Sequence, residues 1–263
     1  MIRIIHNIGG CGGTLLSRCL GVLPGVALLS EMNPGAVKLF PTFDPLYQDA
    51  MWLGLLDAEN IERFSRRDLG ITENFRELLQ VFYDRASAAG RHLVIRDYNY
   101  LDFVGVPFVA VPARRLLLYT ALPRGVPTKS VAFIRHPVDQ WLSLCTHDII
   151  KTALNPSGFC DAYEAFLRGL GTITVHKYED FVERPVAEFQ AICRELSLPF
   201  DISFMERFHT FDSITGSVAR LGDRSISRPQ RKAISLSVMG QFYSSNSFRR
   251  ILRATGYAEQ FPP

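Results

Sequence analysis

Residues 4–20 read IIHNIGGCGGTLLSRCL, and this stretch decides the fold. The apolar, β-branched run before the glycines is typical of a strand buried on both faces of a parallel sheet. After the glycines, apolar residues recur at helical spacing until the turn sequence LPG at residues 23–25. The stretch therefore predicts a strand, a glycine-rich loop and a helix in direct succession.

Four glycines fall within residues 9–13, and Thr14 follows them. Glycine lets the backbone adopt positive φ and approach a ligand closely, so that N–H groups at the start of a helix can face one anion. A simple strand-to-helix turn is the alternative, but four glycines in five residues cost much chain entropy for a mere connection. We therefore interpret the loop as an anion-binding site.

The loop departs from the G-x-x-x-x-G-K-[ST] motif of nucleoside triphosphatases. Gly13 stands where that motif has its lysine, and Ile8 stands where it has its first glycine. Without the lysine, the β- and γ-phosphates of a nucleotide lose their main countercharge. Hydrolysis of ATP or GTP is therefore disfavoured.

Further strands and helices alternate along the chain. Apolar runs at residues 26–30, 92–98, 130–135 and 172–180 predict four more strands. Helical spacing predicts helices over residues 60–90 and 138–149, the latter with Ile149 on its core face. A last helix is expected to follow Asp180, which would cap it, with Val186 on the core face. This order favours a single α/β domain, residues 1–263, in which helices cover both faces of a mostly parallel five-stranded sheet.

The bulk composition narrows the class of protein. Of the 263 residues, 47% are hydrophobic and 21% are charged, as in an ordinary globular protein, which excludes wholesale disorder. The net charge of +3 is too small to indicate nucleic-acid binding, and no apolar run approaches the roughly 20 residues of a membrane span. The cysteines and histidines show no metal-ligand spacing, so we expect no metal, and reduced thiols in a cytoplasmic protein.

Three stretches resemble the signatures of the sulfotransferase family. Residues 9–31, GGCGGTLLSRCLGVLPGVALLSE, are similar to the opening loop and helix of that family. Residues 131–144, VAFIRHPVDQWLSL, are similar to its R-[DN]-P-x-D-x-x-x-S signature, and residues 175–201 resemble its late Y-E-D-L-x-x-x-P segment. The stretches occur in the family's order, so together they carry more weight than any one alone.

The resemblance implies a P-loop-type fold of three layers, α/β/α, with helical insertions, and the donor 3′-phosphoadenosine 5′-phosphosulfate (PAPS). It implies that Arg135 and Ser143 hold the 3′-phosphate of this donor and of its product, adenosine 3′,5′-bisphosphate (PAP). A guanidinium at the carboxyl end of a strand suits that role, because its planar fork matches phosphate. The resemblance places the phosphosulfate on the loop residues Gly9, Gly10, Cys11, Gly12, Gly13, Thr14 and Leu15. We interpret Cys11 as the family's small loop residue and not as a nucleophile.

The leaving group needs a cation that the loop does not supply. Gly10 stands where the family usually has a lysine or arginine, so another residue must stabilise the charge that develops on the bridging oxygen. We assign this role to Arg96, at the end of the third strand. The alternatives are Arg220, Arg224 and Arg228, in a polar loop at residues 212–230 that we interpret as a flap.

Sulfuryl transfer also needs a base that takes the proton of the acceptor. Glu31 follows the second strand beside the loop, where some branches of the family place a catalytic glutamate; the alternative is that it only caps a turn. His136 is the second candidate base. Asp97 is expected to orient Arg96 or the acceptor, or to form an internal ion pair.

The sequence therefore predicts an enzyme that transfers a sulfuryl group from PAPS to a hydroxyl or amine by direct in-line displacement. A P-loop small-molecule kinase and a non-catalytic protein that binds PAP or PAPS are the alternatives. We expect the acceptor to be a small molecule, a carbohydrate or a lipid. Residues 34–90 and 98–127 would select it, and no motif there distinguishes sugars, lipids, peptides and phenols.

Overall fold

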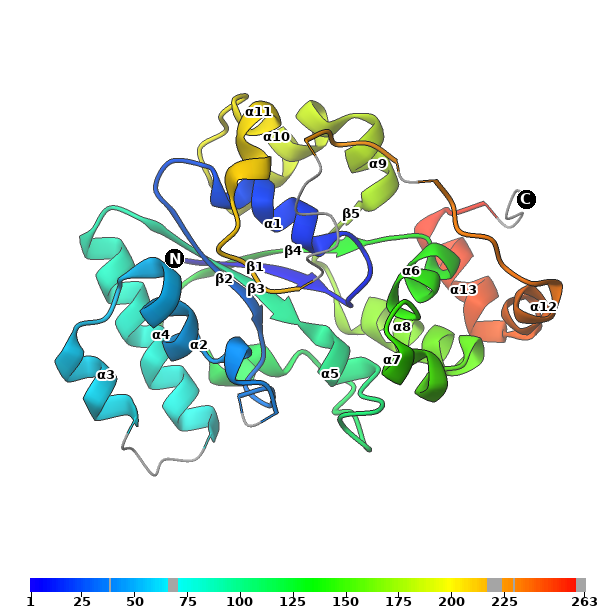
Figure 1. Ribbon diagram of the computed structural model, residues 1–263, viewed down its shortest axis with the longest axis horizontal. Helices are drawn as coiled ribbons and strands as arrows, with labels where there is room; N and C mark the ends of the chain where they lie inside the picture. Colours follow the sequence, from blue (N-terminus) through cyan, green and yellow to red (C-terminus); the bar gives the residue numbers. More distant parts are fainter. Residues whose placement is uncertain (38, 66–70, 217–223, 229, 259–263) are drawn as a thin grey trace.

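The computed structural model describes residues 1–37, 39–65, 71–216, 224–228 and 230–258. At its centre lies a five-stranded sheet in the order β2-β3-β1-β4-β5, and the four pairings between neighbouring strands are parallel (Figure 1). The strands are β1 (Ile2–Asn7), β2 (Val26–Met32), β3 (His92–Tyr98), β4 (Thr128–Ile134) and β5 (Thr174–Lys177). All six residues of β1 are buried, as the apolar run before the glycines predicts.

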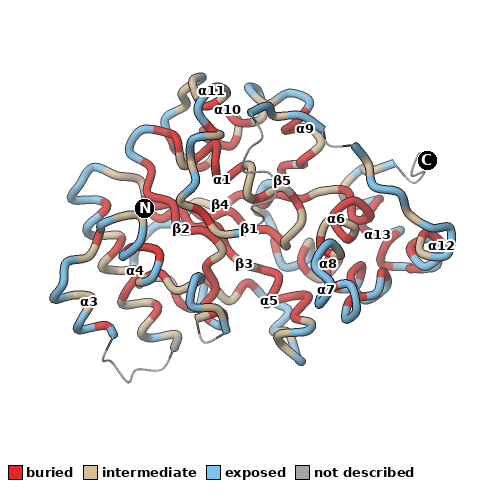
Figure 2. Tube along the Cα trace, viewed as in Figure 1, coloured by how far each residue is buried: buried red, intermediate tan, exposed pale blue. Residues whose placement is uncertain are grey.

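Helices cover both faces of the sheet. Side chains that alternate along the strands enter different cores: Ile5 and Val131 pack on one face, whereas Ile4 and Ala132 pack on the other. Figure 2 shows the buried strands between helices that are exposed on their outer sides. The architecture is therefore the three-layer α/β/α arrangement that the sequence predicts.

The helices of the first face are α1 (Gly13–Gly21), α9 (Tyr178–Glu183), α10 (Pro185–Leu196) and α11 (Phe204–Arg207). The second face carries α4 (Ile71–Ala88), α5 (Asn99–Phe103), α6 (Pro137–Leu144), α7 (Asp148–Ala153), α8 (Pro156–Gly169), α12 (Leu236–Ser244) and α13 (Asn246–Thr255). Between β2 and α4 lie α2 (Pro45–Gln48), a π-helical turn (Asp49–Leu53) and α3 (Ala58–Ser65). Short 3-10 turns occupy Pro41–Phe43, Leu117–Ala121 and Phe208–Thr210. No helix in the described ranges combines the length and apolar character needed to cross a membrane.

The fifth strand is shorter than predicted. It is an edge strand that pairs with β4 over Thr174–Lys177 only, and the chain turns into α9 at Tyr178. Asp180 therefore lies in the first turn of α9 and does not cap the following helix, which begins after Arg184 without a side-chain cap. Val186 is 39% exposed, so its predicted core position is also wrong.

The helix predicted over residues 138–149 is interrupted. α6 ends at Leu144, and a turn at Cys145–His147 resets the helical phase before α7 begins. Ile150 is consequently the buried residue of α7, whereas Ile149 is 57% exposed. The segment predicted as one helix over residues 60–90 contains two, α3 and α4.

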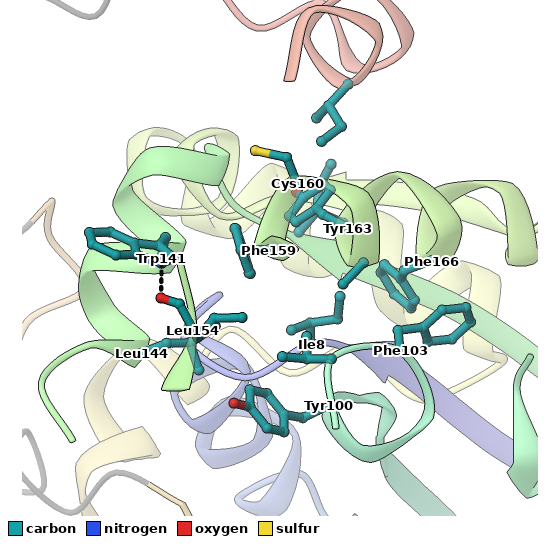
Figure 3. Packing of buried hydrophobic residues seen from close by; sticks show 14 of the residues in the cluster. Ile8, Tyr100, Phe103, Trp141, Leu144, Leu154, Phe159, Cys160, Tyr163 and Phe166 are labelled. Atoms are coloured by element: carbon teal, nitrogen blue, oxygen red, sulfur yellow. Dashed lines mark hydrogen bonds between the residues drawn. The ribbon is translucent and has the colours of Figure 1, made fainter. Parts of the chain in front are cut away.

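One packed cluster supports both the glycine loop and α6 (Figure 3). It holds Ile8, directly before the glycines, together with Trp141 and Leu144 of α6. The indole Nε1 of Trp141 donates a hydrogen bond of 3.1 Å to the carbonyl oxygen of Leu154, which ties α6 to the end of α7. The start of the loop and the helix that bears Ser143 are therefore fixed relative to each other.

Candidate functional site

The glycine loop lies at the carboxyl end of β1 and leads into α1. Gly10 and Gly12 have φ of +81° and +93°, a region in which side chains are strained. A methyl group on Gly10 would lie 2.8 Å from the carbonyl oxygen of Gln140, and one on Gly12 would overlap the ring of Tyr178. These positions therefore require glycine for both conformation and space.

The carbonyl oxygens of the loop are engaged by protein donors. Gln140 Nε2 donates to the carbonyl oxygens of Ile8 (2.9 Å) and Gly9 (3.0 Å), and Leu16 N donates to that of Gly12 (3.2 Å). Cys11 is fully buried, and burial raises the pKa of its thiol to about 11. A loop with its carbonyl groups held in this way is preorganised to present its amides to an anion, and Cys11 packs as a small apolar residue.

A cavity of about 590 Å³ opens at this edge of the sheet. Ten of the eleven residues that the sequence predicts for the site line it: Gly9, Gly10, Gly12, Gly13, Thr14, Leu15, Glu31, Arg96, Arg135 and Ser143. The exception is Cys11, a residue of the loop that is fully buried. Elements distant in the sequence thus place these residues around one space.

Arg135 follows β4 and lies beside the loop, with its Nη1 3.5 Å from the carbonyl oxygen of Gly10. Its guanidinium carbon lies 4.8 Å from the centre of the Tyr178 ring, and Tyr163 donates a hydrogen bond of 2.8 Å to its backbone carbonyl. The Nε of Arg135 is buried without a hydrogen-bond partner among the described residues. Ser143, on the facing helix α6, lines the same part of the cavity.

Arg96, the largest fully buried side chain among the described residues, borders the other end of the loop and is 2% exposed. Its Nη1 donates to Thr14 Oγ1 (3.2 Å), its Nη2 donates to the carbonyl oxygen of Thr215 (2.8 Å), and Nη2 lies 3.4 Å from Glu31 Oε1. Its Nε, like that of Arg135, has no partner among the described residues. The guanidinium groups of Arg96, which is buried, and of Arg135, which is half-buried, therefore line the cavity at the two ends of the loop.

Glu31 occupies a bulge in β2. Leu29 pairs with Ile95 and Met32 with Asp97, so β2 has one more residue than β3 across this interval. Glu31 has φ of +57°, a left-handed conformation that costs about 1–2 kcal/mol for a residue with a Cβ. Such strain is concentrated at functional sites, and here the bulge accompanies a carboxylate that lines the cavity beside Arg96.

Gln48 binds both backbone groups of Ser30, the residue before Glu31 in the bulge. Ser30 N donates to Gln48 Oε1 (2.9 Å), and Gln48 Nε2 donates to the carbonyl oxygens of Ser30 (2.6 Å) and Thr42 (3.1 Å). On the other side of Ser30, Thr215 N donates to Ser30 Oγ (2.9 Å). Segments on both sides of Ser30 thus hold the backbone that carries Glu31.

The remaining residues that the sequence suggested for the site are not among the described residues that line the cavity. Asp97 is on the opposite side of β3 from Arg96 and pairs with His6 Nδ1 at 2.9 Å, so it forms the internal interaction and does not orient Arg96. His136 caps α6 through Nδ1, and burial lowers its pKa to about 4. Like His136, Arg224 and Arg228 are not among the described residues that line the cavity, and both are exposed. Arg220 lies outside the described part of the chain.

The sequence did not identify several residues that line the cavity. Tyr178 matches a family signature, but its position over Gly12 follows only from the packing of α9 against the loop. Tyr47 and Trp52 come from the insertion after β2, which has no regular apolar period. The sequence indicates these positions only through the several aromatic residues of the insertion, and aromatic residues line protein cores as often as cavity walls.

Comparisons with known proteins complete these observations. No family model matches the sequence, and no curated protein matches it significantly. Among solved structures, a sulfotransferase domain from the curacin biosynthetic pathway aligns with 99% of this chain and 98% of its own at a TM-score of 0.66 and 16% identity. A sulfotransferase domain from the Synechococcus PCC 7002 olefin synthase aligns with 99% of this chain and 95% of its own, at a TM-score of 0.63 and 18% identity. The chain therefore has the fold of sulfotransferase domains, as its three signatures predict.

Proposed function

We propose that the protein transfers a sulfuryl group from PAPS to a hydroxyl or amine of a small molecule. The observation that carries this proposal is the pair of guanidinium groups, those of Arg96 and Arg135, that line the cavity at the two ends of the glycine loop. A nucleotide with a 5′-phosphosulfate and a separate ribose phosphate presents anionic oxygens to both. The likeness of the fold to sulfotransferase domains supports the same conclusion.

The donor fits the charged groups of the cavity. Arg135 and Ser143 would hold the 3′-phosphate, and the loop from Gly9 to Leu15 would hold the 5′-phosphosulfate through its amides and the start of α1. Hydrogen bonds from a guanidinium to a phosphate are charge-assisted and contribute about 1.5–3 kcal/mol each. When bound, PAPS supplies the activated sulfuryl group.

Glu31 and Arg96 would then perform the two remaining tasks. Glu31 accepts the proton of the acceptor as the new bond between sulfur and the acceptor atom forms. Arg96 stabilises the negative charge that the phosphate oxygen gains as its bond to sulfur breaks, in place of the cation that the loop lacks at Gly10. Because Arg96 contacts both Thr14 of the loop and Glu31, it lies between the donor end of the cavity and the proposed base.

Two measurements test this proposal. In isothermal titration calorimetry we expect PAP to bind more tightly than ADP or ATP, with or without Mg²⁺. Preference for ATP would overturn the proposal in favour of a kinase.

Turnover with ³⁵S-labelled PAPS over a broad acceptor panel is the second measurement. Glu31→Gln is expected to lower transfer by about 10²- to 10⁴-fold, the usual contribution of a general base, while the affinity for PAP stays within about twofold. Tight PAP binding without transfer to any acceptor would identify a non-catalytic binding protein. Full activity of Glu31→Gln would remove Glu31 from the mechanism.

A further inference from the structure

The last described residues of the chain contact the turn that carries Arg135. α13 ends at Thr255, and Tyr257 follows shortly after it. The ring of Tyr257 packs against the imidazole of His136, with ring centres 5.2 Å apart, and that imidazole also forms a hydrogen bond with the backbone of Ala258. The segment after α13 therefore lies directly beside the residue that is proposed to bind the 3′-phosphate.

Glu179 joins this segment to the backbone of the turn. Its Oε2 accepts a hydrogen bond of 2.8 Å from the hydroxyl of Tyr257, and its Oε1 accepts one of 2.9 Å from the amide N of His136. Burial raises the pKa of Tyr257, and the negative charge of Glu179 raises it further, so the hydroxyl keeps its proton and remains a donor. Both oxygens of the carboxylate are therefore engaged, one by the turn and one by the C-terminal segment.

The peptide group between Arg135 and His136 is held on both sides. Glu179 binds its N–H, and its carbonyl oxygen accepts a hydrogen bond of 2.8 Å from the hydroxyl of the buried Tyr163. Because a peptide group is planar, two fixed partners set its orientation and constrain the direction in which the adjoining side chain of Arg135 leaves the backbone. The partner on the carbonyl side comes from the core, whereas the partner on the N–H side is itself held by Tyr257.

The residues before Glu179 contact the same two groups. The ring centre of Tyr178 lies 4.8 Å from the guanidinium carbon of Arg135, and the ring centre of Tyr257 lies 4.8 Å from Lys177 Nζ. Tyr178 and Glu179 begin α9, so the first turn of this helix contacts Arg135 through its side chain and through its backbone. A shift of this turn is therefore transmitted to the guanidinium.

We propose that Glu179, held by Tyr257 of the C-terminal segment, is a positioning residue that directs Arg135 towards the 3′-phosphate of the nucleotide. The inference rests on the proposed function and adds the segment after α13 to its donor site. Neither Glu179 nor Tyr257 is among the described residues that line the cavity, so both act through Arg135 and not on the ligand. Without Glu179 the N–H of His136 loses its partner, the turn gains freedom, and binding must restore the order that the parent protein already has.

The test compares PAP with adenosine 5′-monophosphate by calorimetry, because the two nucleotides differ only in the 3′-phosphate. We expect Glu179→Ala to weaken PAP binding by about five- to tenfold, a part of the value of a charged hydrogen bond, and to change the affinity for adenosine 5′-monophosphate by less than about twofold. Glu179→Gln still offers an acceptor to His136 and a hydrogen-bonding group to Tyr257, so its PAP affinity should stay within about twofold of the parent. Tyr257→Phe loses only the hydroxyl and should weaken PAP binding by about threefold.

Glu164→Ala is the matched control. Glu164 accepts hydrogen bonds of 2.6 and 2.8 Å from Arg250, so it ties α13 to α8 and not to the turn that carries Arg135. Its loss should leave the affinities for both nucleotides at the parental values, whatever the change in Tm. This control separates a role at Arg135 from a general loosening of the C-terminal helix.

The outcomes distinguish the inference from the proposed function. A parent protein that binds both nucleotides equally would overturn the proposed donor, and the inference with it. If the parent prefers PAP, an equal preference in Glu179→Ala overturns the inference alone, and so does a loss in Glu179→Gln as large as in Glu179→Ala, which would assign the effect to charge. If Glu179→Ala does not fold, Tyr257→Phe gives the same comparison with the ring retained, and parental affinity for PAP in that variant overturns the inference.

Discussion

Replacing Gln48 by alanine tests whether the bulge that carries Glu31 must be held in place. Gln48 is fully buried and makes three hydrogen bonds, two with the backbone of Ser30 and one with that of Thr42. At about 1 kcal/mol each, their loss lowers the free energy of unfolding by about 3 kcal/mol. For a chain of 263 residues this corresponds to a fall in Tm of about 5 °C.

The catalytic effect of Gln48→Ala is expected to exceed the effect on donor binding. Without the hydrogen bonds of Gln48, the backbone at Ser30 relaxes and the Glu31 carboxylate shifts, and a displacement of about 1 Å costs on the order of 10²-fold in rate. We therefore expect kcat to fall by about 10- to 100-fold while PAP affinity, measured by calorimetry, changes less than about twofold. A kcat profile against pH would show the altered base directly.

Gln80→Ala is the matched control. Gln80 makes one hydrogen bond on the exposed side of α4, to Asp84 at 2.9 Å, so its loss costs no more than about 0.5 kcal/mol and leaves kcat unchanged. If Gln48→Ala loses the expected stability but retains parental kcat, the conformation of the bulge does not matter for transfer. The reasoning that makes Glu31 the base would then be refuted.

Two further predictions concern the loop and the buried carboxyl groups. Gly12→Ala should lower PAP affinity at least tenfold, because the added methyl group overlaps the ring of Tyr178. The control Gly54→Ala, at φ +63° in open space, should bind PAP like the parent protein. Equal PAP affinity of the two variants would contradict the role of the loop. Burial and the neighbouring Asp97 raise the pKa of Asp102, so the folded state retains its proton longer and stability falls as pH rises from about 4 towards neutrality. Urea denaturation of Asp102→Asn should show a smaller fall, and an unchanged slope would refute this assignment.

That the residues proposed to bind the donor line one cavity was predictable, because their arrangement is local. Arg135 directly follows β4, and Ser143 lies eight residues later on the next helix, so one strand-helix unit brings them to the cavity. The glycine loop is likewise one continuous segment, and its glycines directly indicate a backbone with positive φ. Arg96 was predictable at the end of β3 because the carboxyl ends of parallel strands meet at one edge.

The part of the cavity around Glu31 depends on contacts between distant segments. Gln48, from the insertion after β2, binds the backbone of Ser30 beside the bulge at Glu31, and no period in the sequence predicts such a side-chain partner. Trp52 lies in a π-helical turn, where neither the strand nor the helix period applies. The early end of β5 has the same origin, since Tyr178 leaves the strand to pack over Gly12.

The most direct test of the account compares two nucleotides on Arg135→Met. PAP and adenosine 5′-monophosphate differ only in the 3′-phosphate, and calorimetry gives both affinities for the parent, for Arg135→Met and for the exposed control Arg168→Met. The account predicts that Arg135→Met weakens PAP binding by about 10- to 100-fold, the value of a charged hydrogen bond, and leaves adenosine 5′-monophosphate unaffected. Equal losses for the two nucleotides, or parental affinity for PAP, would contradict the claim that Arg135 recognises a ribose phosphate.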